Sequence, residues 1–271
     1  MRVLKLRLGG AEKDIAVAAL WERGTLGVAE TEFPGNVWKL EAWFEREFDA
    51  SEFGGDASWM DAPEPVDWRS AWAPAAVGDR LWLVPEWMEA PAPEGRVAVR
   101  VHPGMASGSG DQPATRLALE ALERWLRPGD DVLDVGTGTG ILLAAARALG
   151  AGKLYGCEIG QEEAAIGAAN LKSDGVAAQI WVGSPRSARA EAFDVVVANL
   201  NGATIHALRR EFGRVLKPGG RLILSGFTER WRARLEAEFG WERAGVFEEG
   251  NWRTLALIAS PKSGTDSRPR R

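Results

Sequence analysis

A short apolar segment followed by a glycine-rich turn and a helix rich in Ala and Leu constrains the fold of this chain more than any other feature. The turn lies within the sequence VLDVGTGTG at residues 132–140, and the helix is predicted at 141–149. Glycines let the backbone turn sharply and approach a ligand closely, because they carry no Cβ atom. In an open α/β sheet, a turn of this kind lies at the edge where ligands bind. The segment therefore predicts a sheet of parallel strands with a nucleotide-like ligand at the turn.

Helices and strands alternate from about residue 111 onward. Short apolar runs predict strands at 131–135, 154–158, 179–182, 194–200, 221–225, 244–247 and 252–258. Apolar residues at helical spacing predict helices at 115–126, 141–149, 162–171 and 205–216. This alternation is typical of a mostly parallel sheet with helices on both faces. We therefore expect an α/β fold with a Rossmann-like, doubly wound sheet.

The preceding part of the chain has a different composition, since eight of the 13 tryptophans lie before residue 90. Leu4, Leu6 and Leu8 alternate with polar residues, as in a half-buried strand, and a predicted helix at 11–23 and two more strands follow. This order predicts a small α+β domain of ferredoxin-like type. The expected domains are the α+β domain at 1–62, a Trp-rich linker at 63–100, the ligand-binding domain at 101–260 and a disordered tail at 261–271.

The residues around the glycine turn distinguish between cofactors. The nicotinamide fingerprint is G-x-G-x-x-G, whereas the spacing here is G-x-G-x-G with Asp134 just before it. A carboxylate at this point would repel a pyrophosphate but attract the ammonium group of S-adenosylmethionine (SAM). The next predicted strand ends at Glu158, whose two oxygens can accept both ribose hydroxyls. NAD would share Glu158 but not Asp134, so SAM is the predicted cofactor.

The bulk properties argue against several classes of function. A net charge of -5 and a pI of about 5.4 disfavour nucleic-acid binding, which needs a basic surface, and suit a basic partner better. With one cysteine, Cys157, and two histidines, His102 and His206, we expect no metal site. No apolar run approaches the roughly 20 residues that span a bilayer, and the N-terminal segment does not have the pattern of a signal peptide. We therefore expect a cytoplasmic protein that does not bind membranes.

Further segments carry a resemblance to known enzymes. Residues 194–200 (DVVVANL) and 215–222 (VLKPGGRL) resemble the fourth strand, and the turn into the fifth strand, of class I SAM-dependent methyltransferases. Residues 103–119 (PGMASGSGDQPATRLAL) and the Trp-rich segment at 67–87 resemble the PrmA family, the bacterial enzymes that methylate ribosomal protein L11. The small N-terminal domain is similar in size and element order to the substrate-recognition domain of that family.

The resemblance implies a set of cofactor contacts and a substrate. Thr115, Gly136, Glu158 and Asn199 match family positions that contact SAM, although the family usually has Asp where Glu158 stands. Together with the rest of the turn, the predicted cofactor-binding residues are Thr115, Asp134, Gly136, Gly138, Gly140, Glu158 and Asn199. The implied activity is N-methylation of amino groups on a basic protein, a ribosomal protein, by a chain that we expect to be monomeric.

The loop before the first predicted helix of this domain departs from the family pattern. The family's loop Phe is Ser107 here, its His-His pair is Asp111-Gln112, and its first Thr is Ala114. These changes leave two alternatives open: a relative that methylates another protein or a small molecule, and a SAM-binding module with little catalytic activity. A nicotinamide oxidoreductase is a more distant alternative. The catalytic residues are unknown at this point, because no side chain stands out as a general base.

Overall fold

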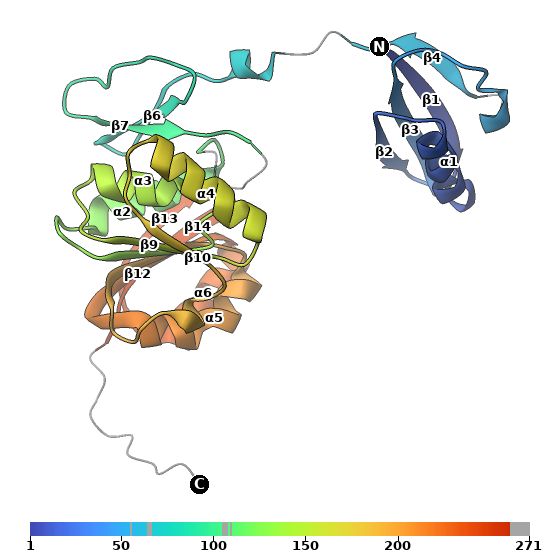
Figure 1. Ribbon diagram of the computed structural model, residues 1–271. Coiled ribbons are helices and arrows are strands. Elements are labelled where there is room, and N and C mark those ends of the chain that lie inside the picture. The colour runs from blue at the N-terminus through green and yellow to red at the C-terminus, as the bar shows by residue number, and fades with distance from the viewer. Residues whose placement is uncertain (55, 64–66, 105–107, 109, 261–271) are drawn as a thin grey trace. The chain divides into compact units, whose positions relative to one another are not determined.

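The computed structural model describes residues 1–54, 56–63, 67–104, 108 and 110–260 (Figure 1). The chain forms two compact units, Met1–Ala71 and Trp72–Arg271, each with its own hydrophobic core. The boundary between the units lies after Ala71, whereas the sequence pattern placed the end of the first domain at residue 62.

The first unit is an antiparallel sheet with one α-helix in its described residues. Its elements are β1 (Arg2–Gly9), α1 (Gly10–Glu22), β2 (Gly27–Phe33), β3 (Val37–Phe44), the 3-10 turn η1 (Ser51–Phe53), β4 (Ser58–Asp61) and the 3-10 turn η2 (Trp68–Ala71). The strand order is β2-β3-β1-β4, which is the arrangement of a ferredoxin-like sheet. The predicted ferredoxin-like order is therefore confirmed, and β4 is a strand that the sequence pattern did not indicate.

Aromatic side chains lie where a ferredoxin-like unit has its second helix. Between β3 and β4 the only helical element among the described residues is η1. The Phe44 ring makes T-shaped contacts with Phe48 and Trp59, at centroid distances of 4.9 and 5.6 Å. Phe48, Phe53 and Trp59 pack against the buried residues of β1 and β3. Because these rings cover the sheet, the loop takes the place of a helix.

The second unit is built on a seven-stranded sheet. Its strands are β8 (Val132–Val135), β9 (Leu154–Glu158), β10 (Gln179–Val182), β11 (Phe193–Asn199), β12 (Leu216–Thr228), β13 (Glu242–Glu249) and β14 (Trp252–Ile258). Their order is β10-β9-β8-β11-β12-β14-β13, and β14 alone runs antiparallel to its neighbours. The chain moves outward from β8 to β10 and returns on the other side of β8. The predicted doubly wound α/β fold is therefore confirmed.

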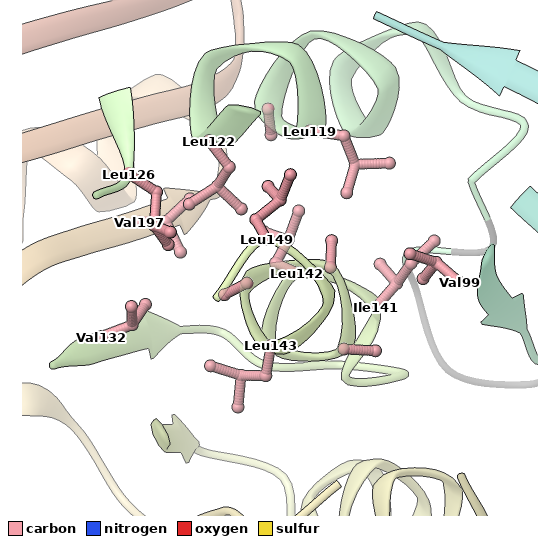
Figure 2. Close-up of a cluster of buried hydrophobic side chains, with 14 of the residues drawn as sticks. Val99, Leu119, Leu122, Leu126, Val132, Ile141, Leu142, Leu143, Leu149 and Val197 are labelled. Atoms are coloured by element: carbon pink, nitrogen blue, oxygen red, sulfur yellow. The ribbon is translucent and has the colours of Figure 1, made fainter. Parts of the chain in front are cut away.

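Helices cover both faces of this sheet. They are α2 (Pro113–Trp125), α3 (Ile141–Ala148), α4 (Gln161–Ser173), α5 (Gly202–Val215) and α6 (Glu229–Phe239). Helices α2, α3 and α4 lie on one face, and α5 and α6 lie on the other (Figure 1). The core beneath α2 and α3 contains aliphatic side chains such as Leu119, Leu122, Leu143 and Val197 (Figure 2). In the described part of the chain, no helix has the length and apolar character needed to cross a membrane.

Part of the predicted linker at 63–100 forms a second, three-stranded sheet. Its strands, in the order β5-β6-β7, are β5 (Ala75–Val77), β6 (Leu81–Pro85) and β7 (Val97–Val101). Leu81, Leu83 and Val99 belong to the core that α2 and α3 form, and Val99 lies near Ile141 of α3 (Figure 2). This part of the segment packs into the second unit because β6 and β7 bury alternate apolar side chains there.

Candidate cofactor site

Three parallel strands bring the predicted polar residues to one edge of the large sheet. The strands β9, β8 and β11 are neighbours in that order. Asp134 lies near the end of β8, Glu158 is the last residue of β9, and Asn199 is the last residue of β11. The strand order reverses between β8 and β11, so this edge is the topological switch point at which open α/β sheets bind ligands.

The turn after β8 requires glycine at position 136. The φ angle of Gly136 is +81°, and a Cβ atom there would lie 2.7 Å from Leu200 Cδ2. The Gly136 N–H donates to the carbonyl oxygen of Cys157 at 2.8 Å, which ties the turn to β9. A side chain at Gly136 would therefore strain the backbone and displace Leu200.

The other two glycines of the turn lie against α4. A Cβ atom at Gly167 of α4 would lie 2.5 Å from the Gly138 carbonyl oxygen. Gly140 has a φ of +87° and precedes α3, and a Cβ atom there would lie 2.9 Å from Leu171 Cγ. Close packing of the turn on α4 thus accounts for Gly140 and Gly167. Contacts of Gly138 and Gly140 with a cofactor remain a prediction.

The carboxylate of Asp134 is buried without a hydrogen-bond partner among the described residues. Its side chain is inaccessible to solvent, and neither carboxylate oxygen has a hydrogen-bond partner among the described residues. Burial, and to a smaller extent the charge of Glu158, raises the pKa of Asp134 well above its ordinary range. Buried polar groups in proteins nearly always have partners. An unpartnered carboxylate next to a glycine turn therefore marks a place for a cation or a hydrogen-bond donor.

Glu158 is oriented by backbone N–H groups. Its Oε2 atom accepts from Gly138 at 3.2 Å, and its Oε1 atom accepts from Ile159 at 2.8 Å and from Gly160 at 3.5 Å. Because each carboxylate oxygen can accept two hydrogen bonds, Oε2 can accept another. The half-buried carboxylate is thus fixed in position and still open to a ligand hydroxyl.

Thr115 and Asn199 contact each other although 84 residues separate them in the sequence. The Asn199 Nδ2 group donates to Thr115 Oγ1 at 3.2 Å. Thr115 lies in the first turn of α2 and is fully buried. The fold therefore brings both residues to the sheet edge at which Asp134 and Glu158 lie.

The positions that depart from the family pattern begin α2. Gln112 is at the N-cap position of this helix without a capping side-chain hydrogen bond, and the carbonyl oxygen of Ala114 accepts a hydrogen bond from a buried hydroxyl. The Arg116 guanidinium donates to the carbonyl oxygen of Asp111. Ser107 lies outside the described residues. The described substitutions are thus part of a helix start that contacts the site.

An apolar pocket of about 420 Å³ lies beside Gly136 and Glu158. Its other lining residues come from the strand ends and the following loops and from α5, and none was predicted from the sequence: Val135, Cys157, Ile159, Gly183, Ser184, Pro185, Leu200, Ala203, Thr204, Ala207 and Leu208. Ile159 is 81% exposed, so a large apolar residue lies open to solvent there. Its place directly after the acid of β9 was the one signal that the sequence offered.

The cysteine and the histidines have other roles. Burial raises the pKa of the Cys157 thiol to about 12, with a smaller contribution from Asp134. The thiol is therefore protonated at neutral pH, and Cys157 is a buried residue of β9. His102 and His206 both contact carboxylates, at 2.6 to 2.9 Å, which their sequence surroundings did not indicate.

The strand order, the single reversed strand and the acidic glycine turn at the switch point define a class I methyltransferase fold. A family model described as ribosomal protein L11 methyltransferase (PrmA) matches residues 36–259. The chain therefore belongs to the PrmA family. Membership confirms the predicted resemblance and SAM as the predicted cofactor, whereas the roles of the individual site residues remain predictions.

The chain is similar to proteins named ribosomal protein L11 methyltransferase. The protein from Paraburkholderia xenovorans is 38% identical over 171 residues, which is 62% of this chain and 56% of the relative. The protein from Chromobacterium violaceum is 36% identical over 203 residues, which is 72% of this chain and 67% of the relative. The chain thus spans little more than half the length of the first of these relatives.

A solved structure is similar over a larger share of its own length. It is described as a ribosomal protein L11 methylase from Lactobacillus delbrueckii subsp. bulgaricus. The two chains are 25% identical, and the match covers 70% of this chain and 99% of the other with a TM-score of 0.64.

Proposed function

We propose that this chain transfers methyl groups from SAM to amino groups of a basic protein, ribosomal protein L11. The observation that carries the proposal is the buried, unpartnered carboxylate of Asp134 at the switch point of a PrmA-family fold. The names of the curated relatives and of the solved structure support L11 as the substrate.

Three kinds of contact would hold the cofactor. The ammonium group of SAM would give Asp134 the positive partner that it lacks. The ribose hydroxyls would donate to Glu158, whose orientation is fixed by backbone N–H groups. The adenine ring would lie in the apolar pocket, next to Ile159 and Leu200. Bound SAM supplies an activated methyl group together with its own leaving group.

Asn199 would face the methyl acceptor. Its amide nitrogen donates to Thr115, so the amide oxygen is the group that can accept a hydrogen bond from an incoming amine. A lysine with a pKa of about 10.4 costs about 4.6 kcal/mol to deprotonate at pH 7, and an apolar surrounding lowers this cost. The chain's contribution is therefore to orient the amine and exclude water, and we assign no general base.

The first unit offers a surface for a basic substrate. A pocket of about 630 Å³ lies beside α1 and η1, and its charged lining residues are Glu12, Glu52, Asp56 and Arg7. Glu52 is ion-paired with Arg23 at 2.8 Å, so Glu12 and Asp56 are the acids that, in a chain of net charge -5, favour a positively charged protein. Substrate recognition by this unit, a monomeric state and a cytoplasmic location belong to the same proposal.

Calorimetry followed by a transfer assay tests this proposal. We expect the chain to bind SAM but not NADH, and to transfer a radiolabelled methyl group to purified ribosomal protein L11. Glu158→Gln should weaken SAM binding, because it removes the charge that accepts the ribose hydroxyls. Glu32→Gln, which changes an exposed carboxylate of β2, is the matched control and should bind SAM normally.

The other outcomes decide between the remaining functions. Binding of NADH alone would exclude the methyltransferase. Tight SAM binding without transfer to L11 or to any protein of a cell lysate would indicate a SAM-binding module. Label on a different protein or on a small molecule would keep the reaction and replace the substrate.

A further inference from the structure

Two buried hydroxyl groups lie between the large sheet and α2. Ser225 of β12 and Thr254 of β14 are both fully buried, and their hydroxyl oxygens are 2.6 Å apart. By strand alternation, Ser225 shares its face with Ile223, which belongs to the apolar core beneath α2. Buried hydroxyls add no apolar packing and need partners. Their presence in this core therefore calls for an explanation other than packing.

The direction of the two hydrogen bonds follows from the groups involved. The Ser225 Oγ atom is 2.6 Å from the carbonyl oxygen of Ala114, which can only accept. Ser225 must therefore donate its proton to Ala114, and Thr254 must donate to Ser225. The pair is satisfied only while the first turn of α2 stays in its present place.

These two hydrogen bonds end at Ala114, next to the predicted site. Ala114 directly precedes Thr115, whose hydroxyl oxygen accepts from the Asn199 side chain. Asn199 in turn lies opposite Ser225 in the parallel pairing of β11 and β12. Ser225 is thus linked to Asn199 in two ways: through the hydrogen bonds at Ala114 and Thr115, and through the pairing of β11 with β12.

The strand itself is irregular at this point. The pairing of β12 with β14 shifts register between Leu224 and Phe227. Within this stretch Gly226 has a φ of +87°, and a Cβ atom there would lie 2.7 Å from Asn199 Oδ1. The Asn199 amide is therefore confined by Thr115 on its nitrogen and by the Gly226 backbone near its oxygen.

We propose that Ser225 and Thr254 are positioning residues, whose hydroxyl pair fixes the start of α2 so that Thr115 holds the Asn199 amide in one orientation toward cofactor and methyl acceptor. The role of this orientation in binding SAM and the methyl acceptor rests on the proposed function. Its geometric claim, that the pair orients Asn199, concerns the free protein and stands separately.

Single and double variants separate positioning from stability. Ser225→Ala leaves the Thr254 hydroxyl buried without a partner and should lower the melting temperature. The double variant Ser225→Ala/Thr254→Val removes both hydroxyls, and replacing both partners with apolar groups of similar shape can be nearly neutral for stability. If the pair were only structural, the double variant would regain both wild-type stability and wild-type SAM affinity. If it positions Asn199, the melting temperature recovers but the affinity does not.

Two measurements distinguish a positioning role from a purely structural one. We expect the double variant to shift the Asn199 side-chain amide resonances in the free protein and to raise the Kd for SAM about fivefold, the effect of roughly one hydrogen bond. Thr254→Ser keeps the hydroxyl and should retain both properties. The control Thr25→Val removes a buried hydroxyl of the first unit, which donates to Gly27 at 2.8 Å, and should change neither.

Wild-type amide resonances and wild-type affinity in the double variant would overturn the inference. If the wild-type chain fails to bind SAM, the proposed function fails instead. In that case the amide resonances of the free protein alone decide whether the hydroxyl pair orients Asn199.

Discussion

At the scale of single residues, Asp134 is a charged side chain in a place where packing alone favours an apolar one. A buried polar group without a partner costs about 1–3 kcal/mol of stability, and Asp134 has no partner among the residues described. The neighbouring strand positions Leu133 and Val135 are apolar and buried. An apolar residue at 134 would therefore favour folding, so packing does not account for the carboxylate, which fits the proposed role in cofactor binding.

The first prediction concerns the charge of this side chain. Asp134→Asn keeps the shape and removes the charge, so we expect it to weaken SAM binding by about tenfold or more, since hydrogen bonds to charged groups contribute about 1.5–3 kcal/mol. Titration calorimetry measures the change. Asp79→Asn, at an exposed position, is the control. Equal affinity of Asp134→Asn and wild type would mean that the cofactor does not contact this carboxylate.

The second prediction concerns pH. The pKa of Asp134 is raised by burial in the folded state, above an unfolded value of about 3.9. Its contribution to stability is thus fully present below pH of about 3.9 and is lost as pH rises through the folded pKa, because the folded state binds the extra proton. Asp134→Asn should therefore gain stability relative to wild type as pH rises, as measured by urea unfolding. A difference that does not vary with pH would contradict the raised pKa.

At the scale of elements, the approach of the glycine turn to α4 is set by backbone contact. The Gly138 carbonyl oxygen lies so close to Gly167 that there is no room for a Cβ atom between them. The glycines of 132–140 show a turn in the sequence, but Gly167 does not stand out there, since a single glycine within a helical pattern has no obvious partner. Only the packed structure identifies what it contacts.

The third prediction follows from this contact. Gly167→Ala should lower the melting temperature and weaken SAM binding, because its Cβ atom would lie 2.5 Å from a backbone oxygen, although alanine in a helix is normally favoured by about 1 kcal/mol. Gly213→Ala in α5 is the comparison, since its nearest neighbour is the ring of Trp241 at 3.2 Å, a side chain that can shift. Differential scanning calorimetry should show a lower melting temperature for Gly167→Ala but not for Gly213→Ala. Equal behaviour of both would contradict the close packing.

Elements that the sequence pattern missed share a physical cause. Helix α6 buries one side chain, Leu235, and Arg232 on it forms ion pairs with Glu229 and Glu236. Because the helix has so few apolar residues facing the core, its sequence does not show a clear helical period. Strand β7 has the expected alternation, but it is only five residues long and follows a Pro-rich segment. Their partners along the sheet and the helix layer, rather than local pattern, define both elements.

At the scale of the whole molecule, the predicted cofactor site and the pocket proposed for the substrate lie in different units. All seven predicted cofactor-binding residues lie in the second unit, after Trp72. The acidic pocket proposed for the substrate lies in the first unit, whose core is separate. Cofactor binding should therefore depend on the second unit alone, and methyl transfer to a protein should depend on both.

The fourth prediction tests this division. A chain that begins at Trp72 should fold and bind SAM within about threefold of the full chain, a difference below about 0.7 kcal/mol. Its transfer of methyl groups to L11 should fall strongly, because the substrate surface is missing. Circular dichroism, calorimetry and the transfer assay measure the three properties. Full transfer activity without the first unit would place substrate recognition elsewhere.

The α/β class, the position of the glycine turn and the acids at the ends of two strands follow from the amino-acid sequence alone. These are local patterns, set by backbone sterics and by the period of apolar residues. Their surroundings come from the folded chain: the Asp134 carboxylate without a hydrogen-bond partner among the described residues, the contact of Thr115 with Asn199, and the apolar pocket beside Glu158. Each of these features depends on groups that are distant in the chain and meet only when the helices pack on the sheet. A local sequence pattern therefore cannot predict them.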